Sequence, residues 1–557
     1  GSTWCLRQNG SDRIRTVILP SWRWYRTDRC KYPIWRISEI SGSILDTKEY
    51  CVQKGQNFGS ALFVVLKENS AGFSNVFDAA VSGGFCGEMF WLFSSLKDIV
   101  NPSDTREERR AYLFSKVYSG GLQGIDGYVV QVEADVSDGL PGFYMVGSLA
   151  SEVKEAEERV RTAMRNAGFH LSSKKITVNL SPANVRKEGT ACDLPVAIAV
   201  LAAYGIIMPP GLKGAGFLGE LGLDGHIKPI RGVLPMVLAM AEKGIRRCFL
   251  AEENVAEGVA ANCMEIVKIH SLQEAVELLN EPERILPECQ DMAPWPDASY
   301  PVDFSEINGQ KLMKRATEVA VAGGHNLLYI GPPGSGKSMM ARRIPTIMPS
   351  LSREEQLEVS KIYSICGMLP QGYALVGTRP YRAPHHTISA QALTGGGIWP
   401  KPGEISLASR GVLFLDELPE FQKKTLEILR QPLEEHQVTV SRVNGSFTFP
   451  AHFMLAVALN PCPCGYYPDR SRCSCTEHQV RRYLGRVSRP LLDRIDICVE
   501  AAPATYRDIR TVQKNESSGT IRARIEQARA LQRERYAGHG IYTNSEMGIR
   551  EIQRFCT

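Results

Sequence analysis

The sequence predicts a multidomain α/β protein in which a domain of mixed α+β pattern precedes a domain built on a parallel sheet. Three observations support this prediction. The chain has 557 residues, which is too long for a single hydrophobic core. Strand and helix patterns are mixed between residues 113 and 280, and short, continuously apolar strands alternate with helical segments between residues 302 and 500.

The composition is that of an ordinary globular protein. Hydrophobic residues make up 43% and charged residues 22%, and the net charge of +5 permits a nucleic-acid partner without implying one. The fifteen cysteines are mostly scattered singly, which favours a reducing, cytoplasmic location. The most apolar run, residues 194–210, is interrupted by Pro195 and Gly205, so we expect a buried helix and no membrane span.

Residues 1–112 stay unassigned. They hold tryptophans at positions 4, 22, 24, 35 and 91 but little sustained helical or strand periodicity. Two interpretations remain open for this segment: a small domain particular to this protein, or a stretch appended by an upstream start.

The α+β pattern between residues 113 and 280 rests on three segments. Residues 128–135 and 176–180 read as strands, and residues 194–204 form a helical run. Between the strands, apolar residues recur at helical spacing: Val153, Ala156, Val160 and Ala163. Residues 281–301 contain five prolines, which predicts an exposed linker.

The parallel sheet is predicted from three buried strands at residues 326–330, 411–415 and 453–459. The first runs directly into a loop and then a helix, in the pattern G-x-x-x-x-G-K-S. Backbone amides of such a loop surround a β-phosphate, its lysine neutralises phosphate oxygens, and its serine ligates Mg²⁺. The predicted residues for ATP and Mg²⁺ are Gly331, Gly334, Ser335, Gly336, Lys337 and Ser338.

Polar residues follow the other two strands. Asp416 comes directly after one strand, where it can orient Mg²⁺, and Glu417 can polarise the attacking water. Asn460 ends the next strand, where it can hold the water or the γ-phosphate. The sequence therefore predicts a site for triphosphate hydrolysis at one edge of the sheet.

These motifs resemble the YifB/ComM family of magnesium-chelatase-like AAA+ ATPases. The resemblance covers residues 113 to the end, with further similarity in Arg382-Ala-Pro-His-His-Thr-Ile-Ser, Leu415-Asp-Glu-Leu-Pro-Glu-Phe, Leu459-Asn-Pro-Cys-Pro-Cys-Gly and Leu491-Leu-Asp-Arg-Ile-Asp. It implies a P-loop AAA+ domain preceded by a Lon-protease-like (ribosomal protein S5-like) domain, working as a homo-hexamer. It also implies a DNA helicase for branch migration in homologous recombination or natural transformation. Asn460 then matches the first sensor and Arg494 the arginine finger.

The sequence departs from the implied pattern at two places. Ala191 stands where the nucleophilic serine of a Lon protease aligns, and Leu234 stands where its lysine aligns, although a slip of one residue brings Thr190 into play. Without a hydroxyl beside an amine there is no nucleophile to activate, so we expect residues 113–280 to have no protease activity. Residues 501–557 are expected to form only a partial helical lid, because no second-sensor arginine is found in them.

A hairpin is predicted at residues 438–449, where alternating apolar residues flank Asn444-Gly445, the preferred pair for a type I′ turn. Arg442 and Asn444 are its candidates for contact with DNA, and a plain exposed hairpin is the alternative.

A cluster of four cysteines, Cys462, Cys464, Cys473 and Cys475, offers the four thiolates of a tetrahedral Zn²⁺ site. Its C-x-C spacing is tighter than the usual C-x₂-C, so unligated thiols or a disulfide pair remain alternatives. Arg470 and Arg472 lie between the two cysteine pairs and are further candidates for contact with DNA.

Two functions follow from the sequence. The first is an ATP-driven motor acting on single-stranded or branched DNA, and the second is a chelatase-type or protein-remodelling ATPase that has no nucleic-acid partner. The basic hairpin and the cysteine loop favour the first, because a remodelling ATPase does not need them.

Overall fold

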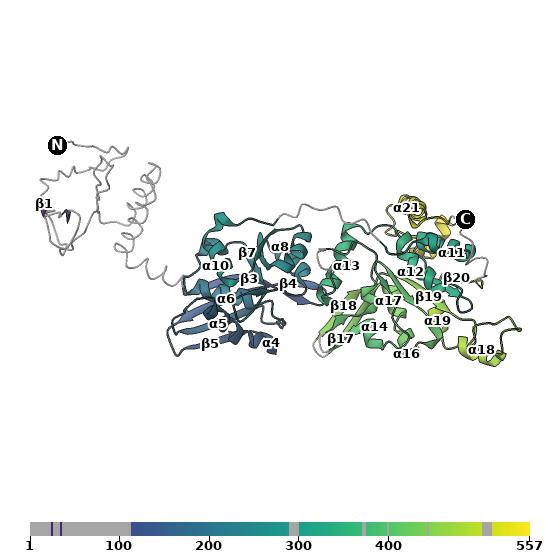
Figure 1. Cartoon of the computed structure of the whole chain (residues 1–557), viewed down its shortest axis with the longest axis horizontal. Coiled ribbons are helices and arrows are strands. Elements are labelled where there is room, and N and C mark those ends of the chain that lie inside the picture. Colours follow the sequence, from purple (N-terminus) through teal and green to yellow (C-terminus); the bar gives the residue numbers. More distant parts are fainter. Residues whose placement is uncertain are drawn as a thin grey trace, which may run out of the picture. The chain divides into compact units, whose positions relative to one another are not determined.

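The computed structural model describes residues 113–288, 300–369, 375–397, 400–442, 445–503 and 515–556, together with two short paired strands, β1 (Trp24–Tyr25) and β2 (Ile34–Trp35). Apart from these strands, the unassigned segment 1–112 lies outside the described residues. In Figure 1 the region 113–288 is coloured from blue to teal, and the region 300–556 from teal to yellow.

The region 113–288 is built on a seven-stranded mixed sheet with the strand order β11-β10-β7-β3-β4-β6-β5. Its strands are β3 (Phe114–Gln123), β4 (Asp126–Ser137), β5 (Gly142–Val146), β6 (Lys175–Ser181), β7 (Ala215–Leu218), β10 (Arg247–Ala251) and β11 (Glu265–Ile269). A separate small pair consists of β8 (Glu220–Leu221) and β9 (Ile227–Lys228). The strands predicted at residues 128–135 and 176–180 lie within β4 and β6.

Helices pack apolar side chains against both faces of this sheet. The helical elements of this region are α4 (Ser151–Lys154), α5 (Ala156–Asn166), α6 (Asp193–Ala203), α7 (Pro209–Leu212), α8 (Val233–Glu242), α9 (Glu252–Ala260), α10 (Leu272–Asn280) and the 3₁₀ turn η1 (Pro282–Arg284). Along β4, Val130 and Val132 belong to the core cluster that contains α6, whereas Val129 packs against the cluster that contains α8. Because successive side chains of a strand point to opposite faces, α6 and α8 cover opposite sides of the sheet.

The apolar run of residues 194–210 begins as α6, in which every residue is buried. Its first residue, Asp193, is only 1% exposed, and Arg159 of α5 forms two hydrogen bonds to its carboxylate, at 2.9 and 3.1 Å. Burial raises the pKa of Asp193, and the arginine opposes that shift. Within the described residues, no helix combines the length and apolar character needed to cross a membrane.

The region 300–556 contains a five-stranded parallel sheet with the order β13-β16-β19-β12-β20. Its strands are β12 (Leu327–Ile330), β13 (Tyr381–Arg382), β16 (Val412–Leu415), β19 (Met454–Leu459) and β20 (Ile497–Glu500). The three strands predicted from the sequence are β12, β16 and β19, which are adjacent in the middle of the sheet. Since parallel strands end at the same edge, the residues that follow them are brought together.

Helices and small antiparallel pairs surround this sheet. The helical elements are η2 (Phe304–Glu306), α11 (Lys311–Gly323), α12 (Lys337–Ile347), α13 (Arg353–Cys366), α14 (Ala390–Thr394), α15 (Glu404–Leu407), η3 (Leu418–Glu420), α16 (Lys423–Glu427), α17 (Arg430–Glu435), α18 (Glu477–Leu484), α19 (Arg489–Leu492), α21 (Ser518–Arg535), η4 (Asn544–Glu546) and α22 (Ile549–Phe555). The small pairs are β14 (Gly395–Gly396) with β15 (Lys401–Pro402), and β17 (Gln437–Arg442) with β18 (Gly445–Pro450).

The segment predicted as a partial lid contains α21 and α22, and α21 packs against α11 and α12. Arg522 donates to the carbonyl of Thr346 in the last turn of α12, and Arg524 donates to Glu318 of α11. These two arginines of α21 therefore hold it against the helices beside the nucleotide loop.

Candidate nucleotide site

The loop between β12 and α12 has the backbone conformation that a phosphate-binding loop requires. Gly334 and Gly336 have φ angles of +77° and +87°, and a Cβ added at either one would meet nothing within 4 Å. Glycine is thus needed there for the left-handed backbone, and space is left open beside the loop. Gly331 is needed for a different reason, because its Cβ would lie 2.5 Å from the carbonyl oxygen of Ala501.

Lys337 begins α12 and folds back over this loop. Its side-chain nitrogen donates to the carbonyls of Gly331 (2.8 Å) and Pro332 (2.9 Å) and to Oδ1 of Asn460 (3.2 Å). The residue is 7% exposed, and burial lowers its pKa, whereas Asp416 and Glu417 act in the opposite direction. A buried cation held by neutral oxygens is well placed to exchange them for phosphate oxygens.

Ser338 and Asp416 meet at the carboxyl end of the sheet. The Ser338 hydroxyl donates to Oδ2 of Asp416 at 2.5 Å, although the two residues are 78 positions apart. A hydroxyl beside a carboxylate next to a phosphate loop is the donor set that Mg²⁺ takes in nucleotide sites. The residues present fit ATP and Mg²⁺, and magnesium bound there would neutralise charge on the phosphate oxygens.

Glu417 lies in the left-handed region, with φ at +52°, which costs a non-glycine residue of the order of 1 kcal/mol. Its backbone N–H donates to Oδ1 of Asp416 at 2.9 Å, and this bond holds the turn. The turn leaves the Glu417 carboxylate 54% exposed, 3.7 Å from Nδ1 of His386. An accessible carboxylate beside the magnesium ligands is able to orient and deprotonate a water molecule.

His386 is a residue of this site that sequence reasoning did not assign. It follows β13, the strand beside β16, and its ring lies 4.0 Å from the ring of His385, centroid to centroid. The signal was present in the segment Arg382 to Ser389, but only the order of the strands shows that this segment ends next to Glu417.

Arg494 does not contact the nucleotide loop of its own chain. Among the described residues, its guanidinium bonds to the carbonyl of Pro490 and to the carboxylate of Glu434 on α17, and its Nε is buried without a hydrogen-bond partner. The structure thus brings Asn460, Lys337 and the Asp416 pair together and leaves Arg494 apart from them.

Comparison with known proteins agrees with this geometry. The family model described as "Magnesium chelatase, subunit ChlI" matches residues 303–509, and the one described as "Subunit ChlI of Mg-chelatase" matches residues 132–254. The competence protein ComM of Haemophilus influenzae is 40% identical over 445 residues, which are 79% of this chain and 86% of that protein. The uncharacterized protein YifB of Salmonella typhimurium is 40% identical over 444 residues, 79% of this chain and 85% of that protein. The chain belongs to the ComM/YifB family of magnesium-chelatase-like AAA+ ATPases.

A weaker similarity connects this AAA+ ATPase with proteases. The Lon protease of Mycolicibacterium smegmatis is 23% identical over 169 residues, which are 28% of this chain and 21% of that protein. In the structure, Ala191 and Leu234 belong to one buried apolar cluster. Thr190 instead donates to the carboxylate of Glu220, and the amine of Lys187 is bound by backbone carbonyls, one of them that of Val185 at 2.8 Å.

The predicted hairpin of this ATPase is β17 paired with β18, but the prediction for its turn is wrong at one residue. Gly445 is the first residue of β18 and pairs directly with Arg442, so it belongs to the strand and not to the turn. The register is set by the cross-strand pairs Val438 with Phe449 and Val440 with Phe447, which point to the same face. Arg442 is exposed, and Asn444 lies outside the described residues.

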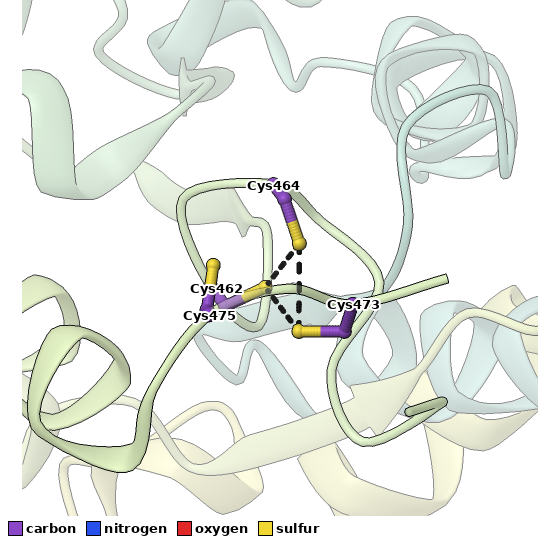
Figure 2. Close-up of side chains that lie close together, drawn as sticks. All are labelled: Cys462, Cys464, Cys473 and Cys475. Carbon is purple, nitrogen blue, oxygen red and sulfur yellow. Dashed lines mark hydrogen bonds between the residues drawn. The ribbon is translucent and has the colours of Figure 1, made fainter. Parts of the chain in front are cut away.

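The four cysteines after Asn460 converge on one point (Figure 2), and their sulfur atoms all lie within 4.8 Å of one another. Sγ of Cys462 is 3.3 Å from that of Cys464 and 3.7 Å from that of Cys473, and Cys464 is 3.5 Å from Cys473. None of the four forms a disulfide. Four Zn–S bonds of about 2.3 Å in a tetrahedron would separate the sulfurs by about 3.8 Å, so the cluster needs little adjustment to hold Zn²⁺.

The loop that carries these cysteines is basic and aromatic. Arg472 lies over the ring of Tyr466, 4.2 Å from its centroid, and Arg470 lies over the ring of Tyr467, 5.1 Å from its centroid. Arg470 also donates to the carbonyl of Cys475 at 3.0 Å. Both arginines are exposed, so the loop places positive charge on the surface beside the nucleotide site.

Proposed function

We propose that this AAA+ ATPase is a DNA motor that uses ATP hydrolysis to move single-stranded or branched DNA, as a branch-migration helicase in homologous recombination or natural transformation. The observation that carries the proposal is the distribution of positive charge. Residues 460–489 contain six arginines and two acidic residues, a formal charge of +4 in a chain whose total is +5. This segment begins at Asn460, which contacts Lys337 of the nucleotide loop.

The charge of this segment lies on the surface. The six arginines, all exposed, are Arg470, Arg472, Arg481, Arg482, Arg486 and Arg489. A basic surface neutralises phosphates and releases counterions, which makes binding to nucleic acids favourable and dependent on salt. Tyr466 and Tyr467 add aromatic rings in the same loop, and aromatic side chains stack on bases without regard to sequence.

The hairpin β17–β18 provides a second surface of the same kind. Val438, Val440 and Phe449 anchor it in the core, so its tip with Arg442 projects from a fixed base. A rigid hairpin that carries an exposed arginine is suited to push against a phosphate backbone.

We propose that the working unit is a ring, with six copies as the expected number. The support is that the nucleotide site has its own lysine, serine and acidic pair, whereas Arg494 is held away from it by Glu434. In a ring, Arg494 would act on the nucleotide of the next copy and complete a site that one chain does not complete.

This arrangement can be tested by mixing two inactive variants. Lys337→Ala removes the cation of a chain's own site, and Arg494→Ala removes the residue expected to act on a neighbour. If Arg494 acts between copies, a mixture regains part of the ATPase activity that each variant lacks alone. A mixture that stays inactive, while each variant still assembles, contradicts the proposal.

The alternative is a chelatase-type or protein-remodelling ATPase, favoured by the description of the family model that matches residues 303–509. The two functions are distinguished by two measurements. One is the rate of ATP turnover with and without a Holliday junction, and the other is the affinity of the protein for that junction at several salt concentrations. The motor requires stimulation by DNA and an affinity that falls steeply with salt. No stimulation and no salt-dependent binding would favour the alternative.

A matched pair of variants locates the DNA surface. Replacing both Arg470 and Arg472 by alanine is expected to reduce the slope of log affinity against log salt by about 2. Arg161 and Arg165 on α5 are also exposed, and their double replacement is the control. If both double variants reduce the slope equally, the effect comes from total charge and does not place DNA at Arg470 and Arg472.

We also propose that the four cysteines bind Zn²⁺. The convergence of four unpaired thiols with sulfur separations near those of a zinc tetrahedron supports it. The cysteines of the described residues are all unpaired, which supports a reducing, cytoplasmic location.

The region 113–280 is proposed to be a Lon-protease-like module without peptidase activity, joined by the linker 281–301 to the motor. Its support is the apolar cluster at Ala191 and Leu234, where a dyad would need a hydroxyl and an amine. Peptide cleavage that depends on Thr190 would overturn this proposal.

A further inference from the structure

The cysteine cluster is physically connected to the nucleotide loop at two points. The first is the chain itself: Asn460, which accepts a hydrogen bond from Lys337, is separated from Cys462 by a single proline. A displacement of Cys462 is therefore passed to the residue that contacts the lysine of the nucleotide site.

The second connection is a close contact between two turns. Gly465 has φ at +87°, and its N–H donates to the carbonyl of Cys462 at 2.9 Å, which closes the turn that carries Cys462 and Cys464. A Cβ added to Gly465 would lie 2.5 Å from Cδ of Pro333. Pro333 belongs to the nucleotide loop, so the turn between the first two cysteines is packed directly against that loop.

We propose that the metal held by the four cysteines and the nucleotide held by the loop stabilise each other's binding, an inference that rests on the proposed zinc site. A metal that joins both cysteine pairs fixes the turn at Gly465 and the start of the loop after Asn460. Gly465, which packs against Pro333, and Asn460, which accepts a hydrogen bond from Lys337, are then held in place before the nucleotide binds. Without the metal, the turn is free to relax, and ordering it becomes a cost of nucleotide binding.

The metal must change nucleotide affinity by the same factor by which the nucleotide changes metal affinity. This holds because the free protein, its two single complexes and the doubly bound protein form one thermodynamic cycle. Couplings of this kind are usually worth about 5- to 150-fold in affinity. We expect the metal to tighten nucleotide binding by about 10-fold, and the nucleotide to tighten metal binding by the same factor.

The experiment uses the full chain. Zinc content is measured by elemental analysis, and the affinity for a fluorescent ATP analogue is measured with Mg²⁺ present. Both measurements are made before and after removal of zinc with 1,10-phenanthroline and again after zinc is returned. The proposal requires weaker nucleotide binding after removal, recovery on return, and tighter zinc binding in competition titrations with nucleotide present.

Three variants separate the possible causes. Cys475→Ser removes one ligand and is expected to reproduce the effect of the chelator, whereas Cys263→Ser, at an exposed cysteine outside the cluster, is expected to change nothing. Pro333→Ala leaves all four thiols in place but removes the contact with the turn at Gly465. It is expected to bind zinc normally and to lose the part of the coupling that depends on this contact.

The outcomes distinguish this inference from the proposals on which it stands. If the purified chain binds no zinc and none can be added, the zinc site fails, and the coupling fails with it. If zinc binds but its removal leaves nucleotide affinity unchanged in a chain with unaltered circular dichroism, the coupling alone is overturned. Neither result decides whether DNA stimulates ATP turnover, so the motor proposal is judged separately.

Discussion

Replacing Lys337 by methionine tests the assignment of the nucleotide site most directly, because the structure predicts a small effect on stability and a large effect on nucleotide binding. In the free chain the amine donates to two carbonyls and to Asn460, but the same burial lowers its pKa, so desolvation offsets much of what the bonds contribute. Methionine fills a similar volume without charge. We expect the free energy of unfolding to change by at most about 1 kcal/mol.

The effect on binding should be much larger. A charge-assisted hydrogen bond contributes about 1.5–3 kcal/mol, and loss of two such bonds to phosphate oxygens amounts to about 3 kcal/mol or more. That difference corresponds to an affinity for ATP at least about 100-fold weaker. ATP hydrolysis should fall to the background at concentrations that saturate the parent.

The measurement pairs nucleotide titration with urea unfolding. Lys311→Met is the matched control, since Lys311 is also the first residue of a helix, α11, and is exposed. A Lys337→Met protein that binds and hydrolyses ATP like its parent would refute the assignment of the loop. A protein destabilised by several kcal/mol would refute the argument that the hydrogen bonds and desolvation nearly cancel.

Three further predictions follow from other contacts. Glu417→Gln is expected to slow ATP hydrolysis at least about 100-fold and to leave ATP affinity within about threefold, because the amide cannot take a proton from water; a turnover assay with a binding titration checks this. Arg159→Met leaves the buried carboxylate of Asp193 without its ion-pair partner, and this should lower the free energy of unfolding by about 3–5 kcal/mol at pH 8. Burial holds the pKa of Asp193 above its unfolded value, so this deficit should shrink as pH falls towards about 4 and the folded carboxyl takes up its proton, which urea unfolding at several pH values would measure. Ala191→Ser alone should give no peptide cleavage in a casein assay, because Leu234 supplies no amine to activate the hydroxyl.

Much of the nucleotide site was predictable because three of the five strands of its sheet are evident from local sequence. β12, β16 and β19 are short apolar runs that end in glycine, aspartate and asparagine, and these patterns give both the element and the chemistry at its end. The turn of the β17–β18 hairpin was predicted at Asn444-Gly445 because this pair is a strong local signal. In the structure Gly445 belongs to β18 instead, in a register that pairs Val440 with Phe447.

Other features could not be predicted from the sequence. Nothing local indicates that His386 lies beside Glu417, because their contact depends on β13 being placed next to β16. The helical spacing from Val153 to Ala163 indicates helical structure, and the structure divides this segment into α4 and α5 on either side of Glu155. Helical spacing identifies the buried face but does not locate such a boundary.

The sequence by itself determined which residues can do chemistry here: the glycine-rich loop with Lys337 and Ser338, the acidic pair after β16, and four cysteines near one another in the chain. Those assignments depend on residue type and short spacing, which folding does not alter. Only the tertiary structure decided that Ser338 meets Asp416, that Arg494 is held away from its own site, and that the turn at Gly465 rests on Pro333. These are contacts between segments far apart in the chain, and they follow from the order of parallel strands, which local sequence does not encode.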